Sequence, residues 1–192
     1  LHARFNGIRD RLMDKTGHLR GSVLVFVNEE DIRFLQGEKT ALKDGDEIIL
    51  PGYTCVMNVN PIKYLGAKPV YVDIEPNTFN VDLNLLRKKI TAKTKVIIVQ
   101  HTYGYPCDMD AITDIAGKHG VAVIEDCCLA FGSRYKGKLT GTFGKAAYFS
   151  FQWNKPYTTG LGGMAITSDS ELAERINKLC EKEACKPPAK EV

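Results

Sequence analysis

The chain has 192 residues, of which 44% are hydrophobic and 26% are charged, and this composition is typical of an ordinary soluble globular protein. The formal net charge of +3 gives no reason to expect nucleic acid or a membrane as a partner. No apolar run approaches the ~20 residues that span a bilayer, and the N-terminal stretch LHARFNGIRDRLMDK lacks the apolar centre of a signal peptide.

The six cysteines do not show the paired Cys-x-x-Cys spacing of a metal site, so we expect no bound metal. Cys127 and Cys128 are adjacent at the predicted end of a buried strand, where free cysteine packs as a small hydrophobic residue. A reducing, cytoplasmic setting explains these residues more simply than a disulfide framework, which suits much smaller secreted domains.

The first 44 residues differ from the rest of the chain. Residues 1–20 are predicted to form a helix, and residues 21–27, GSVLVFV, a strand. Residues 28–31, Asn-Glu-Glu-Asp, contain three acids, which suit the N-terminus of a helix.

From residue 45 onward, predicted strands alternate with predicted helices. Strands are expected at 45–51, 68–74, 95–100, 121–126, 146–152 and 162–167, and helices at 54–66, 81–90, 108–120 and 168–184. We expect Ser168 or Ser170 to cap the last helix. The alternation predicts an α/β fold, with a mainly parallel (mixed) sheet flanked by helices.

Three polar residues follow apolar strands in the segment 121–167. Asp126 ends VAVIED, Ser150 lies in AAYFSFQ, and Lys155 follows in WNK. Ligands of open α/β sheets bind beyond the carboxyl ends of the strands. An acid, a hydroxyl and a lysine gathered there suit a ligand with a basic ring nitrogen, a phosphate and an aldehyde, and pyridoxal phosphate has all three.

Each of these residues also has a plain structural interpretation. A lysine after a strand is commonly a solvated loop residue, and an aspartate at a strand end is commonly a turn former or a helix cap. The serine between two phenylalanines is equally suited to be a small core residue. The order of the three residues, followed by the glycine-rich GLGG, favours a site.

Five motifs occur here in a characteristic order: EDCCLA, GSRYKGK, GTFG, FSFQWNK and TTGLGG. In this order they resemble the DegT/DnrJ/EryC1/StrS sugar aminotransferases, which are pyridoxal-phosphate enzymes of fold type I. The resemblance runs from about residue 45 to residue 167. It implies a cofactor-binding large domain at 45–167, preceded by an atypical segment at 1–44 and followed by a helix and tail at 168–192. The smaller C-terminal domain of the family is expected to be absent.

The resemblance also implies a role for each residue of the candidate site. Lys155 would form the Schiff base with the cofactor and then carry a proton between substrate and cofactor. Asp126 would face the pyridine nitrogen, and Ser150 would bind the phosphate. Family members that are dehydratases have histidine at the position of Lys155, so the lysine favours transamination.

Several positions depart from the family pattern. Leu129 replaces a glutamine or histidine near the ring, Cys55 replaces an aromatic residue that stacks on it, and Leu161 replaces an acid. The acidic segment 28–31 stands where the family has a Ser-Gly-Thr turn that holds the phosphate. Either the phosphate is held differently, or this part of the chain is altered.

Two further residues near the motifs have open roles. His101 matches a histidine common in the family, and it either lines the pocket or lies in the core behind it. Trp153 is next to the lysine motif and is interpreted as a packing residue, with a place at the pocket rim or a subunit contact as the alternative.

The sequence therefore predicts an aminotransferase that moves an amino group from an amino acid, glutamate, to a nucleotide-linked keto sugar for polysaccharide biosynthesis. It is expected to act as a cytoplasmic homodimer. The alternative is a degenerate or truncated domain of the same fold that acts as a binding or scaffold protein. A nicotinamide-binding domain is disfavoured, because no G-x-G-x-x-G motif follows an early strand.

Overall fold

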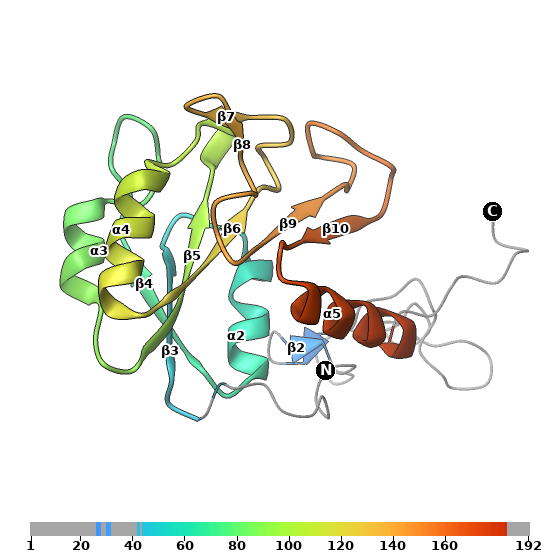
Figure 1. Cartoon of the computed structure of the whole chain (residues 1–192). Coiled ribbons are helices and arrows are strands. Elements are labelled where there is room, and N and C mark those ends of the chain that lie inside the picture. The colour runs from blue at the N-terminus through green and yellow to red at the C-terminus, as the bar shows by residue number, and fades with distance from the viewer. Residues whose placement is uncertain (1–25, 28–29, 32–41, 43, 184–192) are drawn as a thin grey trace, which may run out of the picture.

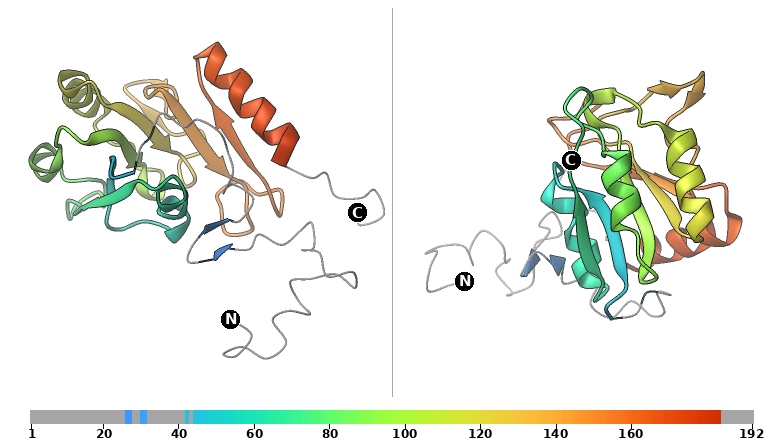
Figure 2. Two further views of the ribbon diagram at one scale, coloured as in Figure 1. Left: turned by 90° about the horizontal axis from the view of Figure 1, so that it is seen from below. Right: turned by 90° about the vertical axis from the view of Figure 1, so that its left-hand side faces the viewer.

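The computed structural model describes residues 26–27, 30–31, 42 and 44–183 (Figures 1 and 2). The predicted helix at 1–20, most of the predicted strand at 21–27 and the tail beyond residue 183 lie outside the described residues. Phe26–Val27 (β1) pairs antiparallel with Glu30–Asp31 (β2), so the end of the predicted strand and part of the acidic segment form a short ribbon.

A six-stranded sheet forms the centre of the described residues (Figure 1). Its strands are β3 (Glu47–Pro51), β4 (Lys68–Val72), β5 (Thr94–Gln100), β6 (Ala122–Asp126), β9 (Ala146–Ser150) and β10 (Gly163–Ile166). Their order is β10-β9-β6-β5-β3-β4, and the strands from β4 to β9 pair in parallel, whereas β10 is antiparallel to β9. The predicted mixed, mainly parallel sheet is confirmed. A second ribbon joins Arg134–Tyr135 (β7) to Lys138–Leu139 (β8).

Helices cover both faces of this sheet, which explains why its strands are apolar without alternation. Along β3, Ile49 packs in a cluster with residues of α3 (Leu83–Lys89) and α4 (Met109–His119). Its neighbours Ile48 and Leu50 point to the opposite face and pack with Ile62 of α2 (Asn60–Tyr64). Figure 1 shows α3 and α4 together on one side of the sheet and α2 on the other. α5 (Ser170–Glu183) follows β10.

Polar caps set the bounds of the helices close to their predicted positions. The Asp108 carboxylate accepts a hydrogen bond from Ala111 N at 3.1 Å, and α4 ends at Gly120, whose φ of 65° is readily adopted by glycine. The Asp82 carboxylate caps α3 by accepting from Asn84 N and Leu85 N. Among the described helices, none combines the length and apolar character that crossing a bilayer requires.

Two details of the predicted helices were wrong. The single helix expected at 54–66 is a 3-10 turn at Val56–Asn58 followed by the short α2, because Pro61 has no N–H to continue the ladder. Neither Ser168 nor Ser170 caps α5. The capping residue is Asp169, whose carboxylate accepts a hydrogen bond from Leu172 N at 3.1 Å. A carboxylate also complements the positive end of the helix dipole.

We expect Gly144→Ala to lower the free energy of unfolding by about 2 kcal/mol, as overpacking of a closed core does. A Cβ at Gly144 would lie 2.6 Å from the backbone oxygen of Val123, so the backbone would have to shift. Gly117→Ala is the matched control, because a Cβ there meets no atom within 4 Å. At this exposed position of α4 the alanine should stabilise by up to about 1 kcal/mol. Urea unfolding of both variants tests the pair, and equal effects would contradict the expectation.

Candidate active site

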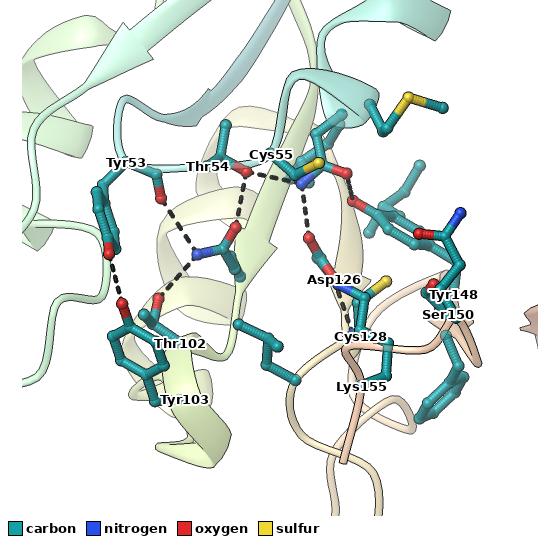
Figure 3. A pocket seen from close by; sticks show the side chains of 18 of the residues that line it. Tyr53, Thr54, Cys55, Thr102, Tyr103, Asp126, Cys128, Tyr148, Ser150 and Lys155 are labelled. Carbon is teal, nitrogen blue, oxygen red and sulfur yellow. Dashed lines mark hydrogen bonds between the residues drawn. The ribbon is translucent and has the colours of Figure 1, made fainter. Parts of the chain in front are cut away.

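A cavity of about 720 Å³ lies at the carboxyl edge of the parallel strands (Figure 3). Asp126 and Ser150 are the last residues of β6 and β9, and Lys155 lies in the loop between β9 and β10. All three line the cavity. The structure therefore brings the three predicted site residues together, because neighbouring parallel strands end at the same edge of the sheet.

Asp126 is held by hydrogen bonds at both of its carboxylate oxygens, and its exposed fraction is only 4%. Oδ2 accepts from Asn58 Nδ2 at 2.6 Å, and Oδ1 accepts from the backbone N–H of Cys128 at 2.9 Å. Asn58 in turn accepts at Oδ1 from the Tyr148 hydroxyl at 2.9 Å. The carboxylate is thus tied to the 3-10 turn after β3 and, through that turn, to β9 (Figure 3).

A second network holds the segment that follows β3 against the end of β5. The Thr54 hydroxyl donates to Gln100 Oε1 at 2.7 Å, and Gln100 Nε2 donates to the backbone oxygen of Tyr53 at 3.2 Å and to the Thr102 hydroxyl at 3.0 Å. The hydroxyls of Tyr53 and Tyr103, which also line the cavity, are hydrogen-bonded to each other.

Sequence reasoning missed Asn58, Tyr148, Thr54 and Gln100. One signal was present, because Gln100 is a polar residue that ends an apolar strand, as Asp126 does. The contact between Asn58 and Asp126 joins residues 68 positions apart, and that between Asn58 and Tyr148 joins residues 90 apart. Local patterns carry no information on pairs so distant.

Burial and negative charge keep two groups near Asp126 protonated. Burial, and then the charge of Asp126, raises the pKa of the Cys128 thiol. The charge of Lys155 lowers this pKa by a smaller amount. The pKa of Tyr148 is raised well above its usual value by burial and then by Asp126. Tyr148 is therefore a hydroxyl donor at neutral pH. Lys155 is the one cationic side chain among the described residues that line the cavity.

The residues that depart from the aminotransferase pattern do not all reach the cavity. Cys55 and Leu129 line it, so the substitutions inferred from sequence fall at the site itself. The side chain of Leu161 is 65% exposed, and the cavity is lined instead by Gly162. Trp153 is 79% exposed, so it does not serve as a core packing residue within the described part of the chain.

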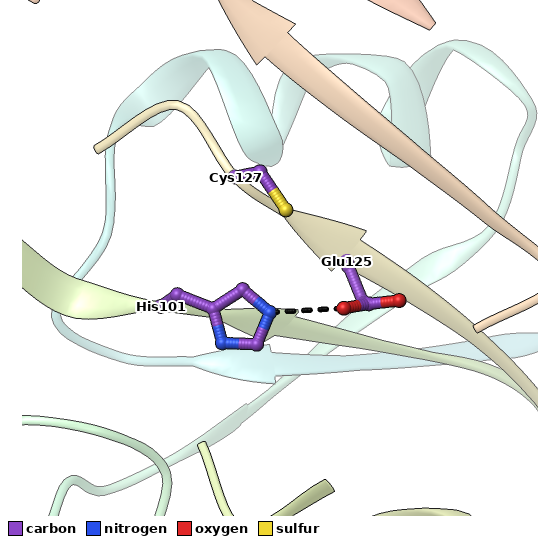
Figure 4. Close-up of side chains that lie close together, drawn as sticks. All are labelled: His101, Glu125 and Cys127. Carbon is purple, nitrogen blue, oxygen red and sulfur yellow. Dashed lines mark hydrogen bonds and ion pairs between the residues drawn. The ribbon is translucent and has the colours of Figure 1, made fainter. Parts of the chain in front are cut away.

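His101 is fully buried and is not among the described residues that line the cavity, which agrees with the interpretation of it as a core residue. Figure 4 shows it beside Glu125. Its Nδ1 accepts from the backbone N–H of Cys107 at 3.0 Å, so the proton is on Nε2, which donates to Glu125 Oε2 at 3.1 Å. Glu125 also accepts from the backbone N–H groups of Gly141, Phe143 and Gly144 at 2.6–2.7 Å.

His101, Glu125 and Cys127 form a buried cluster whose side chains are of the types that bind metal ions, but the ligand atoms of His101 and Glu125 are already hydrogen-bonded within the protein. Possible ligand atoms of His101, Glu125 and Cys127 lie within 4.8 Å of one another. Both ring nitrogens of His101 and both oxygens of Glu125 are engaged in hydrogen bonds, and a metal ion would have to displace them. Burial, and then the charge of Glu125, raises the pKa of the Cys127 thiol to about 12, which opposes thiolate binding.

The chain belongs to the DegT/DnrJ/EryC1/StrS aminotransferase family, whose model matches residues 35–190. It is 48% identical over 134 residues to the GDP-perosamine synthase of Escherichia coli O157:H7. These residues make up 70% of this chain and 37% of that protein.

Solved structures show the same relationship. An aminotransferase named TlmJ from Streptoalloteichus hindustanus has a TM-score of 0.70 and 36% identity, covering 78% of this chain and 40% of that one. The PLP form of a putative sugar aminotransferase from Streptococcus pneumoniae has a TM-score of 0.67 and 32% identity, covering 73% and 40%. The chain thus spans 37–40% of the length of these relatives.

The beginning of the chain is similar to a different family. The ThiS family model matches residues 1–50 and overlaps the aminotransferase match at residues 35–50. The acidic segment 28–31, where the sequence departs from the expected aminotransferase pattern, falls inside the ThiS match and outside the aminotransferase match. The departure seen there in the sequence coincides with this change of family likeness.

The chemistry of the cavity suits pyridoxal phosphate, the cofactor of this family, at its ring end. Asp126 offers a buried carboxylate that accepts hydrogen bonds from two N–H groups, Lys155 offers an amine, and Ser150 offers a hydroxyl, all in one cavity of suitable size. The residues present fit the phosphate group of the cofactor less well. Lys155 is the one cationic side chain among the described residues that line the cavity, so Ser150 has no second cation beside it to bind the phosphate.

Proposed function

We propose that this chain carries the cofactor-binding part of an aminotransferase that moves an amino group from an amino acid, glutamate, to a nucleotide-linked keto sugar. One observation carries the proposal: Asp126 at the end of β6 lines a single cavity together with Ser150 and Lys155, which lie at and just after the end of β9. The likeness to a GDP-perosamine synthase supports a nucleotide sugar as the substrate class.

Each side chain has a defined task in this proposal. When bound, pyridoxal phosphate supplies an aldehyde and a ring that accepts electrons. Asp126 holds a proton at the ring nitrogen, and Ser150 donates a hydrogen bond to the phosphate. The Lys155 amine would hold the cofactor at its aldehyde carbon, with release of the aldehyde oxygen as water, and would then move a proton between substrate and cofactor. Ile98 and Ile124 line the cavity as well and keep water from the ring.

We further propose that the protein works as a homodimer in a reducing, cytoplasmic setting. Five cysteines in the described residues are free thiols, which are typical of such a compartment. A cavity bounded on one side by solvent is suited to completion by a second subunit, and the exposed aromatic residues Tyr53 and Tyr103 lie at this cavity.

A second candidate function is a domain of this fold that binds but does not turn over substrate. It is favoured by the single cation in the described lining and by the loss of an aromatic residue and an amide at Cys55 and Leu129. Each lost contact would weaken cofactor binding by about 1 kcal/mol.

An absorption spectrum followed by a half-reaction separates the two functions. The protein is mixed with pyridoxal phosphate, reduced with borohydride and mapped by peptide mass spectrometry, and we expect the adduct on Lys155. A second sample receives glutamate, and conversion of the bound cofactor to its aminated form is expected. Adducts scattered over surface lysines would overturn the cofactor site. An adduct on Lys155 with no conversion by any amino donor would favour the second candidate.

A further inference from the structure

Asn58 makes three side-chain hydrogen bonds at the edge of the cavity, and the proposed function gives it no role. It ends the 3-10 turn after β3, is 7% exposed, and lines the cavity. Its Nδ2 donates to Asp126 Oδ2 at 2.6 Å and to the Thr54 hydroxyl at 2.7 Å, and its Oδ1 accepts from the Tyr148 hydroxyl at 2.9 Å.

These three bonds allow the amide only one orientation. The Thr54 hydroxyl gives its proton to Gln100 Oε1, so it accepts from Asn58. The oxygens of Asp126 accept as well, so both N–H groups of the amide point toward acceptors and Oδ1 points toward the Tyr148 hydroxyl. A flipped amide would place its oxygen 2.6 Å from a carboxylate oxygen. All the hydrogen-bonding capacity of the amide nitrogen is used.

The same bonds fix the rotation of the Asp126 carboxylate. One oxygen is held by the backbone N–H of Cys128 and the other by Asn58, so the carboxylate plane is fixed at two points. A carboxylate has about four lone-pair positions, and those left over are available to a ligand in the cavity that Asp126 lines.

We propose that Asn58 is a positioning residue, whose amide holds the Asp126 carboxylate in the orientation that pairs with a protonated ring nitrogen. This inference rests on the proposed function, because it assumes a pyridine ring in the cavity. Tyr148 acts one step further back, since its hydroxyl fixes the amide of Asn58. Other titratable groups near Asp126 include Cys127 and Cys128, which follow it on the chain, Cys107, and Lys155, which lines the same cavity.

Asn58→Leu tests the role, because leucine keeps the size of the side chain and removes the hydrogen bonds. The protein is loaded with pyridoxal phosphate labelled with ¹⁵N in the ring, and the signal of the ring nitrogen and its proton is recorded by NMR. We expect a protonated nitrogen with a sharp proton signal in the wild type. In the variant we expect this signal to broaden or vanish, with about tenfold weaker binding of the cofactor.

Asn60→Leu is the matched control. Asn60 lies two residues away and is 3% exposed, but its Nδ2 donates to Met57 Sδ and not to Asp126. It should keep the wild-type signal. Tyr148→Phe is a second test for the case in which Asn58→Leu does not fold, and it should broaden the signal to a smaller extent.

The outcomes distinguish this inference from the proposed function. A Lys155 adduct in the wild type together with an unchanged ring signal in Asn58→Leu, or in Tyr148→Phe if the leucine variant does not fold, would overturn the role of Asn58 alone. A wild-type protein that forms no adduct on Lys155 would overturn the proposed function and this inference with it. An equal loss of signal in Asn60→Leu would show that packing, and not the amide of Asn58, is responsible.

Discussion

Replacing Lys155 with alanine is expected to remove the covalent attachment of pyridoxal phosphate and to lower amino-group transfer by about 10³-fold. Lys155 is the one cationic side chain among the described residues that line the cavity, and in the proposed function its amine is both the point of attachment and the proton carrier. Proton transfer by a positioned side chain contributes roughly 10²–10⁴-fold to a rate. Borohydride reduction and peptide mapping follow the attachment, and conversion by glutamate follows the transfer.

The control for this variant is a lysine far from the cavity. Lys118 lies on α4 with its side chain 68% exposed and pairs with Asp114 at 2.6 Å. Lys118→Ala should leave both the adduct and the conversion unchanged, because an exposed ion pair contributes little. An unchanged visible absorption band in Lys155→Ala would refute the assignment of this lysine, whatever the transfer rate.

Glu125→Gln is expected to lower the free energy of unfolding by about 3 kcal/mol. The carboxylate is fully buried and accepts hydrogen bonds from His101 and from the backbone of Gly141, Phe143 and Gly144. Glutamine would turn an NH₂ group toward some of these donors, and each buried donor left unpaired costs about 1–3 kcal/mol. Urea unfolding at neutral pH measures the loss.

Glu171→Gln is the control, since Glu171 is an exposed residue in the first turn of α5. It should change stability by no more than about 0.5 kcal/mol. A loss for Glu125→Gln as small as that would mean that the loop at 141–144 finds other hydrogen-bond partners.

The same carboxylate should make stability depend on pH. Burial raises the pKa of Glu125, but the hydrogen bonds from His101 and the three backbone N–H groups outweigh burial, and the net pKa lies below the usual 4.5. A group with a lowered pKa in the folded state stabilises fully above its unfolded pKa, and this contribution is lost as pH falls through the folded pKa. The stability gap between wild type and Glu125→Gln should therefore be constant above about pH 5 and narrow below it.

The sequence predicted the sheet well because the sheet depends on local patterns, and the same patterns placed Asp126, Ser150 and Lys155 at one edge of it, where all three line the cavity. An unbroken apolar run such as VAVIED indicates a strand covered on both faces, and an acid at its end marks the edge where ligands bind. The cap at Asp108 and the stop at Gly120 gave α4 to within one residue at each end.

What the sequence could not predict depends on contacts between distant segments. Nothing near Asn58 indicates that its amide reaches the end of β6, and nothing near Glu125 indicates that its partners are at 101 and 141–144. The helix expected at 54–66 was too long because the effect of Pro61 on the turn before it was underestimated. The roles of Lys155, Asp126 and Ser150 stay predictions until the cofactor is bound.

Glu125 also has a consequence for the order in which the chain folds. Its partners lie 16, 18, 19 and 24 residues away along the chain, so several loops must close before the carboxylate can exchange water for protein donors. An ionised group resists dehydration until those donors are in place. We therefore expect desolvation of this residue and closure of the loop at 141–144 to occur in one late, cooperative step, with the carboxylate hydrated in every earlier folding intermediate.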